Sequence, residues 1–364
     1  MAVERKPEIG IGLIGAGRMG SIRAHLSSSH AVVSFLAISD IDLAKASALA
    51  QQTEAAFHTD DNRAVIEHPE VDALIVSTPE GEHTDAICRA LELGKPVLVE
   101  KPISLSLEDA DRILESQAKS DADLYIGYTQ RMRRRFLSVK EQINAGRLGE
   151  VMSARMTIYA ARAVARQVYL RSPHASPITD GLTYMVDMAL WFFEPRKAVR
   201  VYAQAGSEVF SDHPAGLGDY GWAIVTFEDG SAASLGCSWI LPERWPAYVA
   251  TIGMEIFGSE GAIAVDDAHK DVMMVTNEAI PSPYAPDSSV EVAFLGSQMP
   301  GDWALGDFYG PMREETRLFL ERVTTGREIP LCDGETGRRV LELTLAVEKS
   351  ARAGGTLIDL PLKG

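Results

Sequence analysis

The chain has 364 residues, of which 46% are hydrophobic and 24% are charged. This length and composition are typical of a globular protein of about two domains, and they exclude a disordered, collagen-like or coiled-coil chain. The formal net charge of −16 argues against general nucleic-acid binding and against an anionic membrane surface, because both need a basic face on the protein.

The N-terminal residues lack the apolar core of a signal peptide. No apolar run approaches the ~18 residues that span a bilayer. The three cysteines, Cys88, Cys237 and Cys332, are far apart and form no C-x-x-C pair, so we expect neither a disulfide framework nor a metal site. Together these features predict a cytoplasmic enzyme.

Short apolar runs alternate with amphipathic stretches in the first third of the chain. Continuously apolar runs of this length indicate strands that are buried on both faces of a parallel sheet. A helix is expected at 83–93, where Gly94 stops it, and another at 107–120, where Ser106 and Asp109 form a variant of the capping box. The alternation predicts a doubly wound sheet of the Rossmann type. Its strands are expected at 9–15, 32–39, 73–78, 96–100 and 124–127.

Beyond about residue 150 the pattern changes to alternating apolar and polar residues, separated by short turns such as 228–231 and 258–261. Alternation with period two and hairpin-like turns indicates a mostly antiparallel sheet, with helices covering one face. We interpret 277–302, which is rich in Pro, Ser and Asp, as a loop. The expected strands are 151–159, 199–205, 221–227, 232–239 and 248–257, and the expected helices are 180–193, 311–325 and 335–352.

A glycine-rich turn follows the first predicted strand. Residues 15–20 (G-A-G-R-M-G) match G-x-G-x-x-G, and residues 10–15 match it too, but only the later frame follows an apolar strand and precedes a helix. That context lets the backbone approach a pyrophosphate at the helix N-terminus. Asp40 ends the second strand, where an acidic residue binds the adenosine ribose and repels a 2′-phosphate. The sequence therefore predicts a dinucleotide site that favours NAD over NADP.

The segment Glu100-Lys101-Pro102 resembles a motif of the Gfo/Idh/MocA oxidoreductases, the family of glucose-fructose oxidoreductase and inositol dehydrogenase. Four more segments are similar to the same family: S-T-P-E-G-E-H (77–83), G-Y-T-Q-R (127–131), E-I-F-G-S-E-G (255–261) and P-M-R-E-E with a later Phe (311–319). The resemblance covers nearly the whole chain. It implies an NAD-binding Rossmann domain over 1–126 and an α+β domain with a large open sheet over 127–364.

The resemblance also implies site residues. With the glycine motif, it assigns cofactor binding to Gly15, Gly17, Arg18, Met19, Asp40, Thr78, Pro79, His83, Glu100, Lys101 and Gln130. In that family the lysine of E-K-P lies beside the substrate carbon that exchanges hydride, so Lys101 is the leading acid/base candidate. A lysine takes a hydroxyl proton well when burial or the positive nicotinamide lowers its pKa. The alternative is a surface lysine at the end of a strand.

The family's second catalytic element is commonly D-x-x-x-H on a helix. Here Asp180 matches the aspartate, and Tyr184 stands where histidine is usual. A spacing of four residues places both on one helical face, so we expect them to position the substrate or relay a proton. Tyr184 as a buried core aromatic stays open as an alternative, and Asp187 is interpreted as a buried structural partner.

Residues 131–171 hold nine arginines and one lysine against two glutamates, a net charge of +8 within an acidic chain. The run 133–135 has two interpretations of equal weight: a solvent-exposed start of a helix, or a group of arginines with a function. The planar fork of arginine favours carboxylate, phosphate or sulfonate, so an anionic sugar derivative is one hypothesis for the substrate. The expected substrate-binding residues are Arg155, Arg162, Arg166, Arg171 and His174. His174 is also explained as a loop histidine bonded to backbone.

The leading hypothesis is an NAD-dependent dehydrogenase or reductase that acts on a secondary hydroxyl or keto group of a sugar, polyol or sugar acid. The alternative is an NAD-dependent, redox-neutral glycoside hydrolase of the same family that takes a sulfonated or uronic glycoside. A third hypothesis is a regulator that binds NAD(H) without turnover. We expect a cytoplasmic homo-oligomer, a dimer or a tetramer, with a small carbohydrate substrate and no nucleic-acid or membrane partner.

Overall fold

The computed structural model describes residues 7–214, 216–246, 250–266, 272–281, 285, 287–295 and 301–362. Contacts define two compact units, Met1–Met132 with Trp303–Leu341, and Arg133–Asp302 with Glu342–Gly364. The first unit therefore includes a stretch from late in the chain, which the sequence assigned to the second domain. The functional boundary at residue 126 stays a prediction, because neither unit is one continuous stretch.

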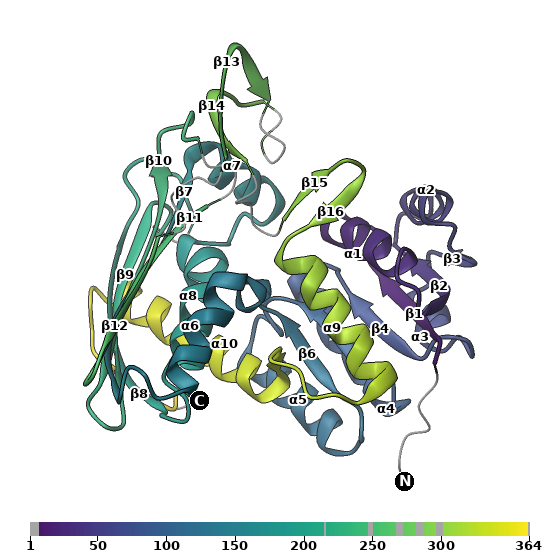
Figure 1. The fold of residues 1–364 in the computed structure, drawn as a ribbon, viewed down its shortest axis with the longest axis horizontal. Helices are drawn as coiled ribbons and strands as arrows, with labels where there is room; N and C mark the ends of the chain where they lie inside the picture. Colours follow the sequence, from purple (N-terminus) through teal and green to yellow (C-terminus); the bar gives the residue numbers. More distant parts are fainter. Residues whose placement is uncertain are drawn as a thin grey trace. The chain divides into compact units, whose positions relative to one another are not determined.

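A mostly parallel sheet forms the centre of the first unit (Figure 1). Its strands are β1 (Ile9–Ile14), β2 (Val33–Ser39), β3 (Phe57–Thr59), β4 (Ala73–Val76), β5 (Val97–Glu100), β6 (Leu124–Gly127) and β17 (Cys332–Asp333). The order across the described sheet is β17-β6-β5-β4-β1-β2-β3. All neighbours are parallel except β17, which pairs with β6 in the antiparallel sense. β1, β4 and β6 are buried along their whole length, as strands covered on both faces must be.

Helices connect these strands and complete the unit. They are α1 (Arg18–Ser28), α2 (Leu43–Thr53), α3 (Asn62–Ile66), α4 (His83–Glu92), α5 (Leu107–Ala118), α9 (Pro311–Thr325) and the first part of α10 (Gly334–Arg352). The Asp42 carboxylate accepts a hydrogen bond from the Ala44 N–H at 3.1 Å and so caps α2. Ser106 Oγ accepts from the Asp109 N–H at 3.1 Å, so the expected cap of α5 is present.

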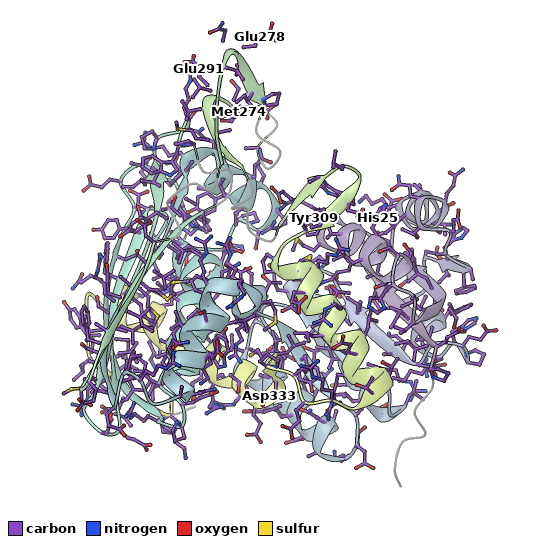
Figure 2. The ribbon with its side chains drawn as sticks, viewed as in Figure 1. His25, Met274, Glu278, Glu291, Tyr309 and Asp333 are labelled. Atoms are coloured by element: carbon purple, nitrogen blue, oxygen red, sulfur yellow. The ribbon has the colours of Figure 1, made fainter. Side chains whose placement is uncertain are left out.

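A short hairpin of β15 (Asp302–Ala304) and β16 (Asp307–Tyr309) adjoins α1 in the first unit. The Trp303 ring meets the His25 ring edge-on, with 5.7 Å between the ring centroids. Phe308 is buried with Ile22 of α1. Figure 2 labels His25 on α1 and Tyr309 at the end of β16. Residues from late in the chain thus cover the helix that follows the glycine-rich turn.

The strand order of the first sheet reverses between β1 and β4. From β1 the chain continues outward to β2 and β3, and from β4 it continues in the other direction to β5 and β6. In doubly wound sheets, ligands bind outside the carboxyl ends of the strands at such a switch point. The segments that follow β1, β4, β5 and β6 are therefore where a cofactor is expected.

A mostly antiparallel sheet forms the centre of the second unit. Its strands are β7 (Val151–Ala161), β8 (Ala198–Gly206), β9 (Tyr220–Phe227), β10 (Ala232–Leu241), β11 (Thr251–Gly258), β12 (Ala262–Asp266) and β18 (Ile358–Asp359). Their order in the described residues is β12-β11-β7-β10-β9-β8-β18. β7 and β10 are parallel, and the other pairs are antiparallel. Burial alternates along β9, which leaves one face of the sheet to helices and the other to solvent.

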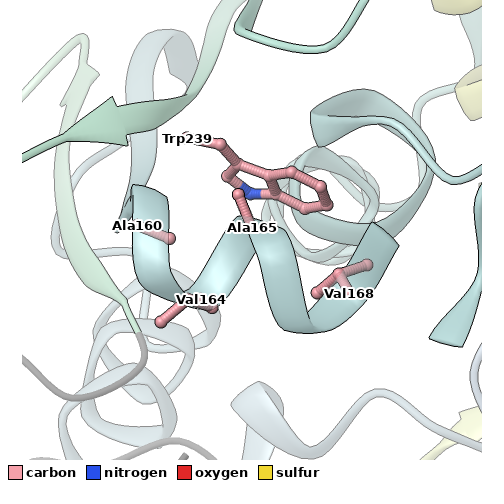
Figure 3. Close-up of a cluster of buried hydrophobic side chains, with 5 residues drawn as sticks. All are labelled: Ala160, Val164, Ala165, Val168 and Trp239. Atoms are coloured by element: carbon pink, nitrogen blue, oxygen red, sulfur yellow. The ribbon is translucent and has the colours of Figure 1, made fainter. Parts of the chain in front are cut away.

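Helices pack on the buried face of this sheet. They are α6 (Arg134–Asn144), α7 (Arg162–Arg171), a π-helical turn at Pro177–Leu182, α8 (Thr183–Phe192) and the remainder of α10. Trp239 of β10 is 3% exposed and packs with apolar side chains from the end of β7 and from α7 (Figure 3). Its indole nitrogen would lie 3.2 Å from a Cβ at Gly181. A glycine is therefore what lets the π-helical turn approach the tryptophan.

A hairpin of β13 (Val272–Pro281) and β14 (Ser289–Leu295) corrects one sequence expectation. The interpretation of 277–302 as a loop is wrong over both strands. Val290 and Ala293 are buried and pack with Met274 and Ile280, a contact between two strands that the Pro- and Ser-rich sequence of 282–288 does not indicate. Figure 2 labels Met274, Glu278 and Glu291 on this hairpin. Residues 248–249 and 296–300, which two of the predicted segments include, lie outside the described residues.

The two sheets confirm the predicted fold class, a Rossmann-type parallel sheet followed by a mostly antiparallel one. The predicted strand ends agree with the observed ends to within a few residues wherever the chain is described. β12 was not predicted; none of its five residues is fully buried, and exposed and half-buried residues alternate along it. The helices of the described ranges include none long and apolar enough to cross a membrane.

Candidate active site

The glycine-rich turn after β1 has a different requirement at each glycine. Gly15 has φ +96°, and a Cβ there would lie 2.7 Å from the Ser77 carbonyl oxygen. A Cβ at Gly20 would lie 1.9 Å from the Gly15 carbonyl oxygen. Gly17 has no atom within 4 Å of its ideal Cβ position. Gly15 therefore makes the turn, Gly20 allows α1 to approach it, and Gly17 borders open space before the helix N-terminus, where a pyrophosphate binds in this motif.

Asp40 follows β2 and is held by two backbone groups. Its Oδ2 accepts from the Ala16 N–H at 2.8 Å, and its Oδ1 accepts from the Asp42 N–H at 2.9 Å. The carboxylate thus links the end of β2 to the glycine-rich turn. Each carboxylate oxygen can accept more than one hydrogen bond, so both retain capacity for a ribose hydroxyl. The residue types and their placement fit the adenosine end of a dinucleotide.

Buried polar atoms without a hydrogen-bond partner occur at the same edge of the sheet. Among the described residues they include Ser77 Oγ and Thr78 Oγ1 after β4 and both amide atoms of Gln130 after β6. Gln130 is fully buried. Proteins leave few buried polar atoms unsatisfied, so such a group calls for an explanation. A polar ligand that inserts at the ends of β4 and β6 would satisfy them, which fits a bound dinucleotide.

Glu100 ends β5 and belongs to a buried ionic cluster. Arg23 of α1 is fully buried and donates from Nε to Glu100 Oε1 at 2.9 Å and from Nη2 to Glu315 Oε2 at 2.5 Å. Its Nη1 donates to Thr316 Oγ1 at 2.8 Å. Burial alone would lower the pKa of Arg23, but Glu100 and Glu315 hold it above the ordinary value, so the guanidinium stays charged. The glutamate before Lys101 is thereby oriented by α1 and α9.

Sequence reasoning missed Arg23 and Glu315. They are 292 residues apart, and no local pattern connects them. One signal could have pointed to Arg23: it is a charged residue among the apolar residues Ile22, Ala24 and Leu26 of α1, which are buried as well. Such a residue needs a partner of opposite charge, but the sequence alone does not say which one.

Lys101 and Pro102 form the first residues after β5. Lys101 is half-buried, and the Lys101–Pro102 peptide bond is cis. His83, the first residue of α4, lies beside this loop with Nδ1 3.0 Å from the Pro102 carbonyl oxygen. Its Nε2 is 3.1 Å from the Thr78 carbonyl oxygen. Both ring nitrogens therefore face backbone acceptors, and any contribution of His83 to cofactor binding acts through the two loops that carry these carbonyls.

The second unit carries Asp180 and Tyr184 on one continuous helical segment. Asp180 lies in the π-helical turn, and Tyr184 lies in the first turn of α8. Ser176 and Thr179 form a reciprocal capping box at the start of the turn. π-Helical turns occur often at functional sites. Both side chains are half-buried, whereas Asp187 is fully buried, as the structural interpretation of Asp187 requires.

The predicted substrate-binding arginines have acceptors within the second unit. Arg155 makes a two-point contact with Glu255, at 2.7 and 2.6 Å. Arg166 pairs with Glu243, and Arg162 Nε donates to the Ile240 carbonyl oxygen at 3.3 Å. Arg171 Nη2 lies 3.7 Å from Asp180 Oδ1. Of the predicted set, the structure places Arg171 beside Asp180, and it leaves His174 exposed.

Arg155 is separated from the others by the sheet. In the sheet, Arg155 of β7 lies opposite Ser234 of β10, and Ser234 lies opposite Ile224 of β9, which is exposed. Residues opposite each other in neighbouring strands have their side chains on the same face. Gly221 lies on the opposite face, because its Cβ position is 2.6 Å from the Ile178 side chain in the π-helical turn. Arg155 therefore lies on the outer face of the sheet, away from the face on which Asp180 is carried.

Two family models match the chain. Residues 9–128 match the model described as an oxidoreductase family with an NAD-binding Rossmann fold, and residues 136–264 match the GFO/IDH/MocA C-terminal domain. A myo-inositol 2-dehydrogenase of Thermotoga maritima is 27% identical, over 93% of this chain and 95% of the relative. An inositol 2-dehydrogenase of Rhizobium meliloti is 30% identical, over 70% of this chain and 75% of the relative. The chain belongs to the Gfo/Idh/MocA oxidoreductase family.

Solved structures share the fold. A probable dehydrogenase from Thermotoga maritima superposes with a TM-score of 0.79 at 24% identity and covers 97% of this chain and 99% of its own. A scyllo-inositol dehydrogenase from Lactobacillus casei, solved with bound NAD(H) and scyllo-inositol, has a TM-score of 0.80 at 18% identity, with coverage of 97% and 99%. At this level of identity the structures support the fold alone.

Proposed function

We propose that this protein is an NAD-dependent dehydrogenase that oxidises a secondary hydroxyl group of a cyclic polyol or sugar. The observation that carries the proposal is the cluster of unsatisfied buried groups at Ser77, Thr78 and Gln130, at the sheet edge where Lys101 follows β5. Relatives named inositol dehydrogenases support a polyol substrate. Bound NAD would supply the hydride acceptor.

Each unit contributes a part of the proposed chemistry. Residues of the first unit hold the cofactor, with the N-terminus of α1 facing its phosphates and Asp40 its ribose. Lys101 Nζ takes the hydroxyl proton as the hydride leaves, because an alcohol cannot give up hydride alone without forming a high-energy cation. Asp180 and Tyr184 of the second unit position the hydroxyl by hydrogen bonds or relay its proton. Gly15, Gly17, Arg18, Met19, Thr78, Pro79, His83, Glu100 and Gln130 complete the proposed cofactor set.

Cofactor preference gives a first prediction. Replacing Asp40 by asparagine removes the charge that repels a 2′-phosphate but keeps an oxygen for the Ala16 N–H. We expect KM for NAD to rise about tenfold and the kcat/KM ratio of NADP to NAD to rise by at least as much. Asp42→Asn is the matched control, because Asp42 caps α2 two residues later. An unchanged ratio in the Asp40 variant would contradict the assignment.

The experiment that tests the function itself is a proton NMR time course. The protein and NAD are mixed with neutral polyols, anionic sugars and their glycosides. Accumulation of NADH with a keto product on a neutral polyol is the expected result. Release of an aglycone with NAD unchanged overall would establish the redox-neutral glycosidase instead, and NAD binding without turnover would favour the regulator. Turnover confined to anionic sugars would support the anionic-substrate hypothesis, which stays a prediction.

The proposal also includes self-association of the chain as a dimer or a tetramer. The outer face of the second sheet exposes apolar side chains that share one side: Trp222 and Ile224 on β9 and Phe257 on β11, which are 40%, 46% and 48% exposed. Exposed apolar patches of this kind are typical of interfaces. We expect Trp222→Glu to shift the protein from a dimer or tetramer to a monomer in light scattering, and Leu170→Glu, on α7, to leave the mass unchanged. A wild-type protein that is monomeric in light scattering would contradict the proposed self-association.

A further inference from the structure

His83 connects two loops that the proposed mechanism uses. It is fully buried at the start of α4, and its ring lies between the Thr78 carbonyl oxygen after β4 and the Pro102 carbonyl oxygen after β5. β4 and β5 are neighbouring parallel strands. One loop carries the unsatisfied Thr78 Oγ1, and the other begins with Lys101.

The chemistry of the ring limits what it can do for these carbonyls. A carbonyl oxygen only accepts hydrogen bonds, and a neutral imidazole has a single N–H to donate. Burial lowers the pKa of His83 below its ordinary value, against the opposing influence of the two carbonyls, Glu80 and Glu100, so the ring is neutral near pH 7. The proton therefore resides on Nδ1 or on Nε2, and each tautomer serves one loop.

We propose that His83 is a positioning residue whose single N–H fixes one of the two loops: with the proton on Nδ1 it holds the Lys101–Pro102 loop, and with the proton on Nε2 it holds the Thr78 loop. The proposal rests on the proposed function, in which Lys101 exchanges the hydroxyl proton. Pro102 is the next residue after Lys101, so a movement of its carbonyl displaces the backbone that carries the lysine. Proton transfer depends steeply on such displacements. Movement of the Thr78 loop instead affects the groups that face the cofactor.

Two amide side chains separate the contacts. The asparagine amide nitrogen reaches the position of Nδ1, and the glutamine amide nitrogen reaches that of Nε2. His83→Asn therefore keeps a donor for Pro102, and His83→Gln keeps a donor for Thr78. We expect one variant alone to depart from the wild type. With the proton on Nδ1, His83→Gln lowers kcat about tenfold and keeps KM for NAD within about twofold; with the proton on Nε2, His83→Asn raises KM for NAD about fivefold and nearly retains kcat.

Hydrogen exchange gives a readout that does not depend on turnover. In the full chain without substrate, we expect the variant with altered kinetics to show the matching exchange response: faster exchange in the peptide 101–106 for His83→Gln, or in the peptide 77–82 for His83→Asn. His58→Gln, at an exposed position on β3, is the matched control and should change neither. Thermal melts of all variants identify any general loss of structure.

The outcomes separate the two proposals. If the wild-type protein turns over no polyol but the His83 variants still show the expected exchange response, the role of His83 in the loops is upheld and the proposed function is wrong. A response of both variants, or of neither, would overturn the proposal that a single N–H of His83 fixes one of the loops. If one variant melts below the assay temperature, the other still tests the proposal, because its kinetic constant and the exchange of its loop must change together or not at all.

Discussion

Replacing Lys101 by alanine is expected to lower kcat by about 10²–10⁴-fold, the range over which a positioned acid or base contributes to proton transfer. KM for NAD should change little, because the glycine-rich turn and Asp40 stay in place. Initial rates of NADH formation on the substrate identified by NMR measure both constants. Lys45→Ala, at an exposed position on α2, is the control and should match the wild type.

Lys101→Arg sharpens this prediction. Arginine keeps a positive charge at the end of β5 but holds its proton at any working pH. We therefore expect Lys101→Arg to bind NAD as the wild type does and to turn over as poorly as the alanine variant. A Lys101→Arg enzyme with more than a tenth of wild-type kcat would mean that the charge, not proton exchange, is what the position supplies.

Replacing Arg23 by methionine is expected to destabilise the first unit by about 3–5 kcal/mol, because it leaves the Glu100 and Glu315 carboxylates buried without their shared partner. Without the cation between them, the two carboxylates repel each other in a site shielded from solvent. Urea unfolding combined with hydrogen exchange in α1 and α9 reports on this unit.

A second substitution tests the origin of that loss. Glu315→Gln in the Arg23→Met background removes one of the two buried charges and should restore part of the stability. Arg338→Met is the matched control, since Arg338 pairs with Asp111 near the surface and such pairs contribute about 1 kcal/mol or less. A loss below about 1 kcal/mol for Arg23→Met would show that the cluster does not hold the unit together.

The parallel strands of the first sheet were predictable because burial on both faces leaves a continuous apolar run, as in β4 and β6. The glycine-rich turn was predictable because Gly15 and Gly20 each answer a local steric demand. The resemblance of Glu100-Lys101-Pro102 to a family motif singled out Lys101, and the apolar run before it predicted the strand that it follows. Each of these features has its sequence signal within a stretch of a few residues.

Other features depend on contacts that no local pattern records. Glu315 meets Arg23 across almost the whole chain. The two contacts of His83 require the ends of β4 and β5 to be side by side. Asp180 lies in a π-helical turn in which Gly181 packs against Trp239, whereas the sequence suggested a regular helix. The pairing of Arg155 with Glu255 likewise depends on the register of β7 with β11.

The late segment of the first unit has a consequence for synthesis. A ribosome completes β6 long before it makes Glu315 or β17, which covers the outer edge of β6. Until then the nascent nucleotide domain has an open sheet edge, and Arg23 lacks one of its two carboxylates. Exposed edges invite pairing with other chains. The N-terminal part of the first unit, residues 1–132, therefore reaches its final form only after nearly the whole message has been translated, so the order of folding differs from the order of synthesis.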